Sequence, residues 1–331
     1  MTIDRSARYI FLFLITGLLS CTVHRQPTTT ESWEFVDNDT EPVARHEAAF
    51  VAVGDRYYLL GGRGIRPVSV FDTRTQRWTE GAKPPVEIHH FQPVVYGREI
   101  YLLGAMTGEY PGETPLPHVY IYNPDRDEWR QGHEIPEDRR RGGAGVVLHD
   151  GLIYLVCGIR DGHRGDHKNW LDAYDPATGA WTQLPDAPRP RDHFQAAVVD
   201  GKLYAAAGRT TVAATNPFAN TIGAVDVYDI NSGRWTTLDR ELPTRRAGTA
   251  AIGLRDKLIV IGGESDTQEP AHAEVEALDV NSGLWTAMPP LVRGRHGTGV
   301  ILDDDHLIMA SGCGQRGGQP ELADMIRAKL K

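Results

Sequence analysis

The chain has 331 residues, of which 40% are hydrophobic and seven are tryptophan, so it can bury a large core and is not globally disordered. Three cysteines exclude a disulfide scaffold or a cysteine-rich zinc module, and a formal net charge of −9 argues against a nucleic-acid binder held by a global basic field. The 35 glycines and 21 prolines, with few long helical patterns, indicate many short strands and turns.

The first residues have the pattern of an export signal. Arg5 and Arg8 precede Tyr9–Leu19, an apolar run of 11 residues that is too short to span a bilayer. The run ends in Leu-Leu-Ser-Cys, which resembles a bacterial lipobox, and that resemblance implies cleavage before Cys21 and acylation of its thiol and new amine. We therefore predict a signal peptide over residues 1–20. The alternative is an ordinary secretory signal, which would leave a secreted or periplasmic protein.

The segment that follows the signal is polar. Residues 21–32 are rich in threonine, which is typical of a flexible tether. Thr22, rather than an aspartate, follows the predicted lipidated cysteine, and in a Gram-negative organism this implies the outer membrane. We predict an exported protein that is lipid-anchored at the outer membrane or cell surface and contacts the membrane through the anchor only.

A repeat of about 50 residues organises the rest of the chain. Five tryptophans lie 51, 52, 54 and 50 residues apart, and a period near 50 is typical of propellers and repeat arrays. Each follows an Asp or Asn by six residues, and six apolar runs end in small residues. The runs are 57–62, 100–105, 153–158, 203–208, 258–263 and 307–312. Each unit is predicted to form four short strands, a to d, and because one such sheet cannot bury both faces, the units must stack in a ring.

Counting the strands predicts how the ring closes. Six ab pairs are present but only five complete cd pairs follow them, while Trp33 marks an unpaired d strand at the N-terminus. Segment Glu31–Val36 should therefore complete the last blade beside Ile301–Gly312. Strand c of that blade is predicted within Glu321–Leu330, with a short helix there as the alternative. The fold class is all-β, a six-bladed propeller over residues 33–331.

These units resemble the kelch-repeat β-propellers of the galactose-oxidase-like superfamily. The double glycine Gly61-Gly62 and the segments Tyr174–Trp181 and Tyr228–Trp235 match the kelch pattern, and the resemblance covers roughly residues 33–325. It implies a six-bladed ring that serves as a binding platform. Galactose oxidase itself holds copper with Tyr and His beside a Cys–Tyr crosslink. No such Tyr/His pair is recognisable here, so no metal and no cofactor are predicted.

Two of the three cysteines are predicted to stay unpaired. Cys157 belongs to the third unit and Cys313 to the sixth, which face each other across a six-bladed ring. Their Cα atoms cannot come within the roughly 7 Å that a disulfide needs.

One face of the ring is predicted to carry the binding site. The a–b and c–d turns are short, whereas the b–c loops are long and varied (105–118, 159–170, 209–224, 264–274 and 313–320). In five of six units an arginine precedes strand a on that same face. These predicted ligand-binding residues are Arg45, Arg141, Arg191, Arg246 and Arg295. They suit an anionic ligand; the alternative is that they only hold the blades together.

Histidines accompany the arginines at the starts of strand a. The predicted ligand-binding set also contains His46, His89, His90, His193 and His296. Glu47, His90 and His193 are the candidate catalytic residues, because neutral imidazoles beside carboxylates can perform acid–base chemistry. No H-x-x-H spacing supports a metal site among them.

The long loops add further candidates. His163 and His167, with Asp161 and Asp166, form either a calcium or zinc site or a solvated loop. The aromatic residues of these loops either stack on sugar rings or anchor the loops. They are Tyr110, Trp170 and Phe218.

Three functions remain open at this point. The favoured interpretation is a non-catalytic module that binds a polar or anionic glycan or peptide, with no nucleic-acid partner. Whether the protein is an enzyme stays undecided. A sugar mutarotase or epimerase acting on sialate is the second hypothesis, because the export signal, the six blades and the arginine-rich mouth resemble that bacterial family of exported kelch propellers. A structural lipoprotein that uses the propeller rim is the third.

Overall fold

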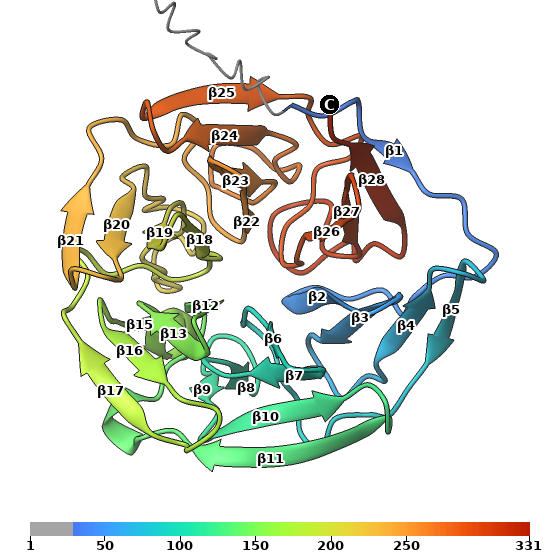
Figure 1. Cartoon of the computed structure of the whole chain (residues 1–331), viewed down its shortest axis with the longest axis horizontal. Helices are drawn as coiled ribbons and strands as arrows, with labels where there is room; N and C mark the ends of the chain where they lie inside the picture. Colours follow the sequence, from blue (N-terminus) through green and yellow to red (C-terminus); the bar gives the residue numbers. More distant parts are fainter. Residues whose placement is uncertain (1–28) are drawn as a thin grey trace, which may run out of the picture.

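The computed structural model describes residues 29–331, and these form a ring of six four-stranded antiparallel sheets (Figure 1). Signal peptide, lipidation at Cys21 and most of the tether lie outside the described residues. Within residues 29–331 the helices are two single 3₁₀ turns, η1 (Glu137–Arg139) and η2 (Gly162–Arg164). None of the described helices has the length and apolar character to cross a bilayer.

Each blade runs from an inner strand beside the central channel to an outer strand at the rim. Blade 1 contains β2 (Ala48–Val53), β3 (Arg56–Gly61), β4 (Ser69–Asp72) and β5 (Arg77–Glu80). Blade 2 contains β6 (Val94–Tyr96), β7 (Glu99–Leu102), β10 (His118–Asn123) and β11 (Glu128–Glu134). Blade 3 contains β12 (Gly145–His149), β13 (Leu152–Val156), β16 (Leu171–Tyr174) and β17 (Trp181–Leu184).

Blades 4 to 6 continue the same order around the ring. Blade 4 contains β18 (Ala197–Val199), β19 (Lys202–Ala205), β20 (Asp226–Asp229) and β21 (Arg234–Thr237). Blade 5 contains β22 (Ala250–Leu254), β23 (Lys257–Ile261), β24 (Val275–Asp279) and β25 (Leu284–Met288). Blade 6 contains β26 (Ile301–Asp303), β27 (His306–Ala310), β28 (Met325–Lys329) and β1 (Glu34–Phe35).

The last blade is closed by the first strand, as predicted. Glu34 lies opposite Arg327 and Phe35 opposite Ile326 in the pairing of β1 with β28. The alternative of a short helix is wrong, because this segment is the strand β28. The pairing also starts earlier than Trp33: Thr30 is bridged to Leu330, so the end of the predicted tether belongs to the blade.

Tryptophans on the outer strands join neighbouring blades. The indole of Trp129 donates to the carbonyl of Ala82 at 3.2 Å, and the indole of Trp235 donates to the carbonyl of Pro185 at 2.8 Å, in each case from one blade to the segment leaving the previous one. Each core cluster likewise contains residues of adjacent blades. This packing explains why tryptophan marks the period of the sequence.

Glutamines on the inner segments tie blades together below the loop face. The side chain of Gln92 accepts hydrogen bonds from the backbone of Val146 and Ala196, each at 2.8 Å, and donates to the carbonyl of Ala196. Gln195 makes similar bonds to Ala251 and Thr298 of blades 5 and 6. These two side chains cross-link five blades around the channel.

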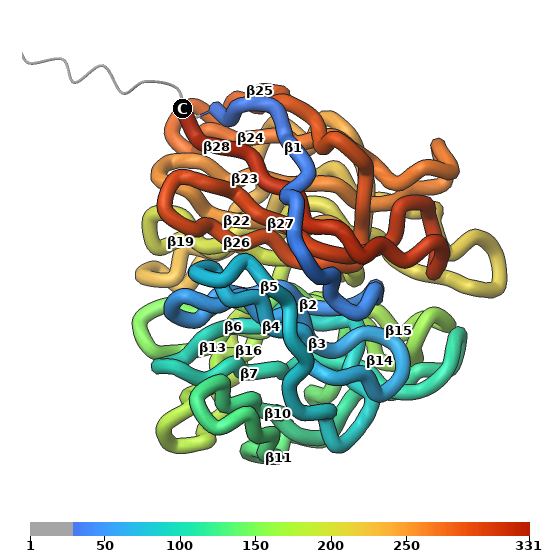
Figure 2. Tube along the Cα trace, turned by 90° about the vertical axis from the view of Figure 1, so that its right-hand side faces the viewer, coloured from blue at the N-terminus to red at the C-terminus, as the bar shows by residue number. Residues whose placement is uncertain are grey.

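The long b–c loops all project from one side of the ring, which we call the loop face (Figure 2). Two of them carry small hairpins, β8 (Met106–Thr107) with β9 (Thr114–Pro115), and β14 (Ile159–Asp161) with β15 (Gly165–His167). Cys157 and Cys313 are the free cysteines of the described part, and both are buried.

Candidate functional site

A closed ring of backbone hydrogen bonds surrounds the channel at the loop face. One residue of each blade, just before strand a, contributes to it, and all six have a positive φ between 52° and 65°. We call this set the mouth ring: Glu47, His90, Gly143, His193, Gly248 and Gly297. The amide of each of these residues from His90 to Gly297 donates to the carbonyl of the preceding member, over 2.6–3.2 Å, and the amide of Ala48 donates to the carbonyl of Gly297.

Three members of the mouth ring carry side chains where glycine would be the unstrained choice. Glu47, His90 and His193 have φ values of 52°, 53° and 54°, a region that non-glycine residues adopt at an energetic cost. The other three positions are glycine and leave space over the channel. The three predicted catalytic candidates are thus the side chains that the mouth ring presents, and retention of strained residues is typical of functional sites.

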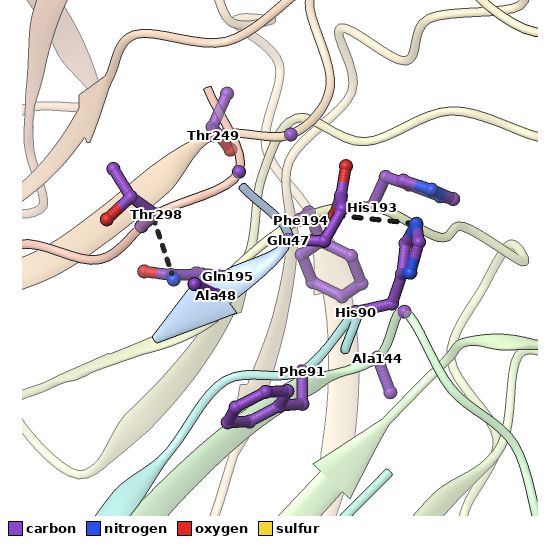
Figure 3. Close-up of a pocket in the computed structure, with 13 residues that line it drawn as sticks. Glu47, Ala48, His90, Phe91, Ala144, His193, Phe194, Gln195, Thr249 and Thr298 are labelled. Atoms are coloured by element: carbon purple, nitrogen blue, oxygen red, sulfur yellow. Dashed lines mark hydrogen bonds and ion pairs between the residues drawn. The ribbon is translucent and has the colours of Figure 1, made fainter. Parts of the chain in front are cut away.

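The side chains of the mouth ring meet over the channel (Figure 3). His90 Nε2 lies 3.4 Å from Glu47 Oε2, and the rings of His90 and His193 have centroids 4.8 Å apart. His163, from η2 in the loop of blade 3, joins them: its Nε2 lies 3.2 Å from Nε2 of His193. All three histidines are buried.

Burial lowers the pKa of three of the histidines here, His89, His90 and His193. Burial and the neighbouring His89 hold the pKa of His90 well below its ordinary value. Burial, with the charge of Arg209 adding to it, lowers the pKa of His193. Burial and Arg63 lower the pKa of His89 to about 4. Neutral imidazoles have a free lone pair, so they can accept a proton, accept a hydrogen bond or ligate a metal.

The neighbouring carboxylates are ionised. Burial alone would raise the pKa of Asp192, but its contact with His193 outweighs this and brings the pKa to about 2. Burial likewise opposes ionisation of Glu113, whose contacts with His163 and Arg63 nevertheless hold its pKa far below the usual range.

A cavity of about 480 Å³ lies on the loop face above this cluster. Its walls combine charges of both signs with two aromatic rings and come from all six blades. They include His46, Glu47, Arg63, His90, Tyr110, His163, Arg209, Phe218, Glu264 and the segment 317–319. Beneath it a narrow space of about 40 Å³ continues into the channel past Glu47, His90 and His193. The mouth ring thus separates an outer chamber, sized for a small ligand, from a water-sized inner one.

The other predicted histidines mainly fix the loops. His46 contacts Glu321 at 2.7 Å, and His89 contacts the carbonyl of Gly108 at 3.1 Å. His296 is buried against the carbonyls of Gln315 and Gly317 at 2.8 and 3.0 Å. Of these three, only His46 lines the cavity.

The prediction that five arginines line the ligand site is wrong. Arg45, Arg141, Arg191, Arg246 and Arg295 are at most 1% exposed and point into their own blades. Each donates to the carbonyl of the residue 16 positions further along the chain, at the end of strand b. In blades 3 to 6 each also pairs with an acid of the same blade (Asp172, Asp226, Glu276 or Asp324). We therefore give these arginines a structural role and leave them out of the proposed site.

Of the candidate residues predicted in the long loops, some line the cavity and others only anchor their loops. Asp166 pairs with Lys168 at 2.5 Å and His167 contacts the carbonyl of Thr211 at 2.9 Å, so the blade 3 loop does not gather its own acids around His163. Tyr110 and Phe218 line the cavity. Trp170 instead lies under the guanidinium of Arg139, at 4.1 Å, and anchors its loop.

Residues outside the predicted set complete the site. Arg63, Arg209 and Glu264 each follow directly after the small residues that end strand b, in blades 1, 4 and 5, and all three line the cavity. In the sequence an arginine stands at this position or one residue later in units 1, 3 and 4 (Arg63, Arg160 and Arg209), so the repeat itself marks the two cavity arginines. Glu113 and His163 lie in irregular loops, and no repeat signal marks them.

Fold and site together define a kelch-type six-bladed β-propeller with one open loop face. The chain matches the family model described as Attractin/LZTR1 beta-propeller over residues 18–268, and it belongs to that family.

Two kelch-like proteins and a sulfolyase are among the known proteins with similar sequences. The chain is 28% identical to Kelch-like protein terF of Aspergillus terreus over 81% of its own length and 61% of that protein. It is 25% identical to Kelch-like protein 38 of Rattus norvegicus, over 63% of this chain and 35% of that one. It is also 25% identical to N-(sulfonatooxy)prop-2-enimidothioate sulfolyase of Thlaspi arvense, over 74% of this chain and 79% of that protein. The chain thus spans about three fifths of the length of Kelch-like protein terF and about one third of the length of Kelch-like protein 38.

A solved structure supports the fold. The one described as the structure of YjhT superposes with a TM-score of 0.73 and 18% identity, over 89% of this chain and 99% of that one.

Proposed function

We propose that this protein is an exported, lipid-anchored module that binds a polar or anionic ligand, a carbohydrate or a peptide, in the cavity of the loop face. The observation that carries the proposal is a cavity of about 480 Å³ to which all six blades contribute. Convergent polar groups in one well-formed cavity over a rigid scaffold are the usual sign of a binding site.

The composition of the walls favours a carbohydrate. A sugar ring presents apolar faces and a rim of hydroxyls that both donate and accept hydrogen bonds. The ring of Tyr110 is 52% exposed at the cavity and Phe218 lies on another wall. Arg63 and Arg209 supply donors, and Glu47 and Glu264 supply acceptors.

The start of the described chain is compatible with an N-terminal anchor. Thr30 is bridged to Leu330, whose amide donates to Asp305 in the a–b turn of blade 6. The a–b turns lie on the face opposite the long loops. The first described residues therefore lie on the side of the propeller opposite the cavity.

Replacing Phe218 with alanine is expected to weaken carbohydrate binding at least about tenfold, which corresponds to about 1.4 kcal/mol of lost stacking. The measurement is a glycan array with the full-length chain, followed by titration calorimetry with uronate, sialate and neutral sugars. Phe35→Ala is the control, because Phe35 is an exposed phenylalanine (50%) that lies on the rim strand β1, away from the cavity lining. Equal losses in both variants, or binding only of peptides in a parallel array, would refute a carbohydrate site.

A sugar-active enzyme is the second candidate, favoured by the 3.4 Å approach of Glu47 to His90 beside the cavity. An ionised carboxylate and an imidazole on one site are the groups that mutarotation or epimerisation needs. We expect the full-length chain to accelerate anomer exchange of sialate, followed by NMR, and Glu47→Gln to remove most of that acceleration. Exchange no faster than in buffer would exclude this activity.

A further inference from the structure

We propose that His90, His163 and His193 together bind one divalent transition-metal ion, with a coordination position left open toward the cavity. This site does not depend on the carbohydrate ligand proposed above. A ligand oxygen, from a carboxylate or hydroxyl group, is the chemistry that the open position would accept.

The first argument is the distance between the ligand atoms. One nitrogen of each of the three histidines lies within 4.8 Å of the others. His163 Nε2 and His193 Nε2 are 3.2 Å apart. Two ligands of a tetrahedral zinc ion, each bonded at about 2.0–2.1 Å, are separated by roughly 3.3–3.4 Å. The pair is therefore spaced as two ligands of one ion, and His90 needs only a small side-chain shift to become the third.

The second argument is the orientation of the rings. The Nδ1 atom of His193 contacts Asp192, and Nδ1 of His163 lies 3.0 Å from Glu113. Nδ1 of His90 is likewise occupied, by His89 at 2.6 Å. A carboxylate hydrogen-bonded to the far nitrogen, as Asp192 is to His193, orients histidine ligands in metal sites because it fixes the tautomer and leaves Nε2 for the ion.

The third argument is charge. Three carboxylates contact these histidines, Glu47, Glu113 and Asp192, and in the described chain only Glu113 has an arginine as ion-pair partner, Arg63 at 2.5 Å. The ion-pair partners of Asp192 and Glu47 are histidines. Glu47 and Asp192 thus lie in a largely buried site where their ion-pair partners are imidazoles, and a divalent cation bound there would be a counterion for them.

The ligand set indicates the class of metal and the kind of site. Three imidazole nitrogens suit ions such as Zn²⁺, Fe²⁺, Co²⁺ or Ni²⁺ rather than Ca²⁺ or Mg²⁺, which prefer oxygen. Three protein ligands are typical of sites that keep a position for water or substrate. Glu47 Oε2 lies 3.4 Å from Nε2 of His90 and lines the same cavity.

The test is a metal titration of the full-length chain, prepared without a polyhistidine tag and stripped with a chelator. With ZnCl₂ in the calorimeter we expect one ion per chain. With Co²⁺ we expect the intense visible absorption of tetrahedral coordination. His163→Gln should weaken binding by at least about 100-fold, more than the roughly 10–100-fold loss expected for Glu113→Gln, which removes an orienting carboxylate.

The matched control is His149→Gln, because His149 also contacts an acid, Asp150 at 3.5 Å, but ends β12 beside an a–b turn on the opposite face. Zinc should raise the midpoint of thermal unfolding for the wild type and this control only. His193→Gly, which suits the backbone at φ 54°, serves if His163→Gln does not fold. Absence of one-to-one binding, or equal affinity in the His163 and His149 variants, would overturn the proposal. Glycan binding measured on stripped protein separates this result from the carbohydrate proposal.

Discussion

Replacing Arg246 with methionine is expected to lower the free energy of unfolding by about 3–5 kcal/mol, the cost of leaving a buried charge without its partner. The guanidinium of Arg246 is fully buried, pairs with Glu276 at 2.5 Å and donates to the carbonyls of Gly262 and Val260. Its removal takes the arginine donor from both carbonyls and from the carboxylate, which keeps the hydroxyl of Thr244 at 2.9 Å. Urea unfolding followed by far-UV circular dichroism measures the loss.

A double variant tests the physical reason. Arg246→Met combined with Glu276→Met removes the unpaired carboxylate, so it should be more stable than Arg246→Met alone by about 1–3 kcal/mol. Blade 2 is a natural precedent, since Ile88 and Tyr120 occupy these two positions there. Arg98→Met, which breaks an exposed pair with Asp125, should change stability little. A double variant no more stable than the single one would contradict the assigned pairing.

Replacing Trp33 with alanine is expected to cost about 3–5 kcal/mol, the range for deleting a large buried side chain. Trp33 is 4% exposed and packs with Met288, Leu291 and Ile326, which belong to blades 5 and 6. The substitution would therefore leave an empty space in the core between blades 5 and 6, where the first strand closes the ring. We expect a lower unfolding midpoint and faster proteolysis near the N-terminus.

Trp235 provides the comparison for this variant. It occupies the corresponding position of blade 4 but is only partly buried. Trp235→Ala should thus lower the free energy of unfolding less than Trp33→Ala. The opposite order would mean that closure by the first strand contributes little to stability.

The propeller could be predicted from the sequence because its signal is repeated. Each blade must place a tryptophan against the next blade and small residues at the end of strand b, so the same side chains return about every 50 residues. The closure by residues 31–36 followed from the same count. The count does not predict that the pairing with the last blade begins at Thr30, because Thr30 belongs to no repeated pattern.

The site was only partly predictable, and the arginines show why. Arg45 and Glu47 are two residues apart, and in an extended strand they would share a face. The left-handed backbone at Glu47 interrupts that alternation, so Arg45 points into the blade while Glu47 faces the channel. Backbone conformation at one position decided which side chains line the cavity, and residue spacing does not reveal it. His163 was placed by an irregular loop for which the other blades offer no comparison.

The pairing of β1 with β28 also sets the order in which the molecule can be completed. Glu34 and Arg327 are 293 residues apart. At a synthesis rate of about 5–20 residues per second, the first strand waits roughly 15–60 s for its partner to be made. This long-range pairing is entropically costly and slow compared with the hairpins inside each blade. Ring closure is therefore the last pairing open to the nascent chain, and any chain truncated before Met325 would leave residues 34–35 without a neighbouring strand.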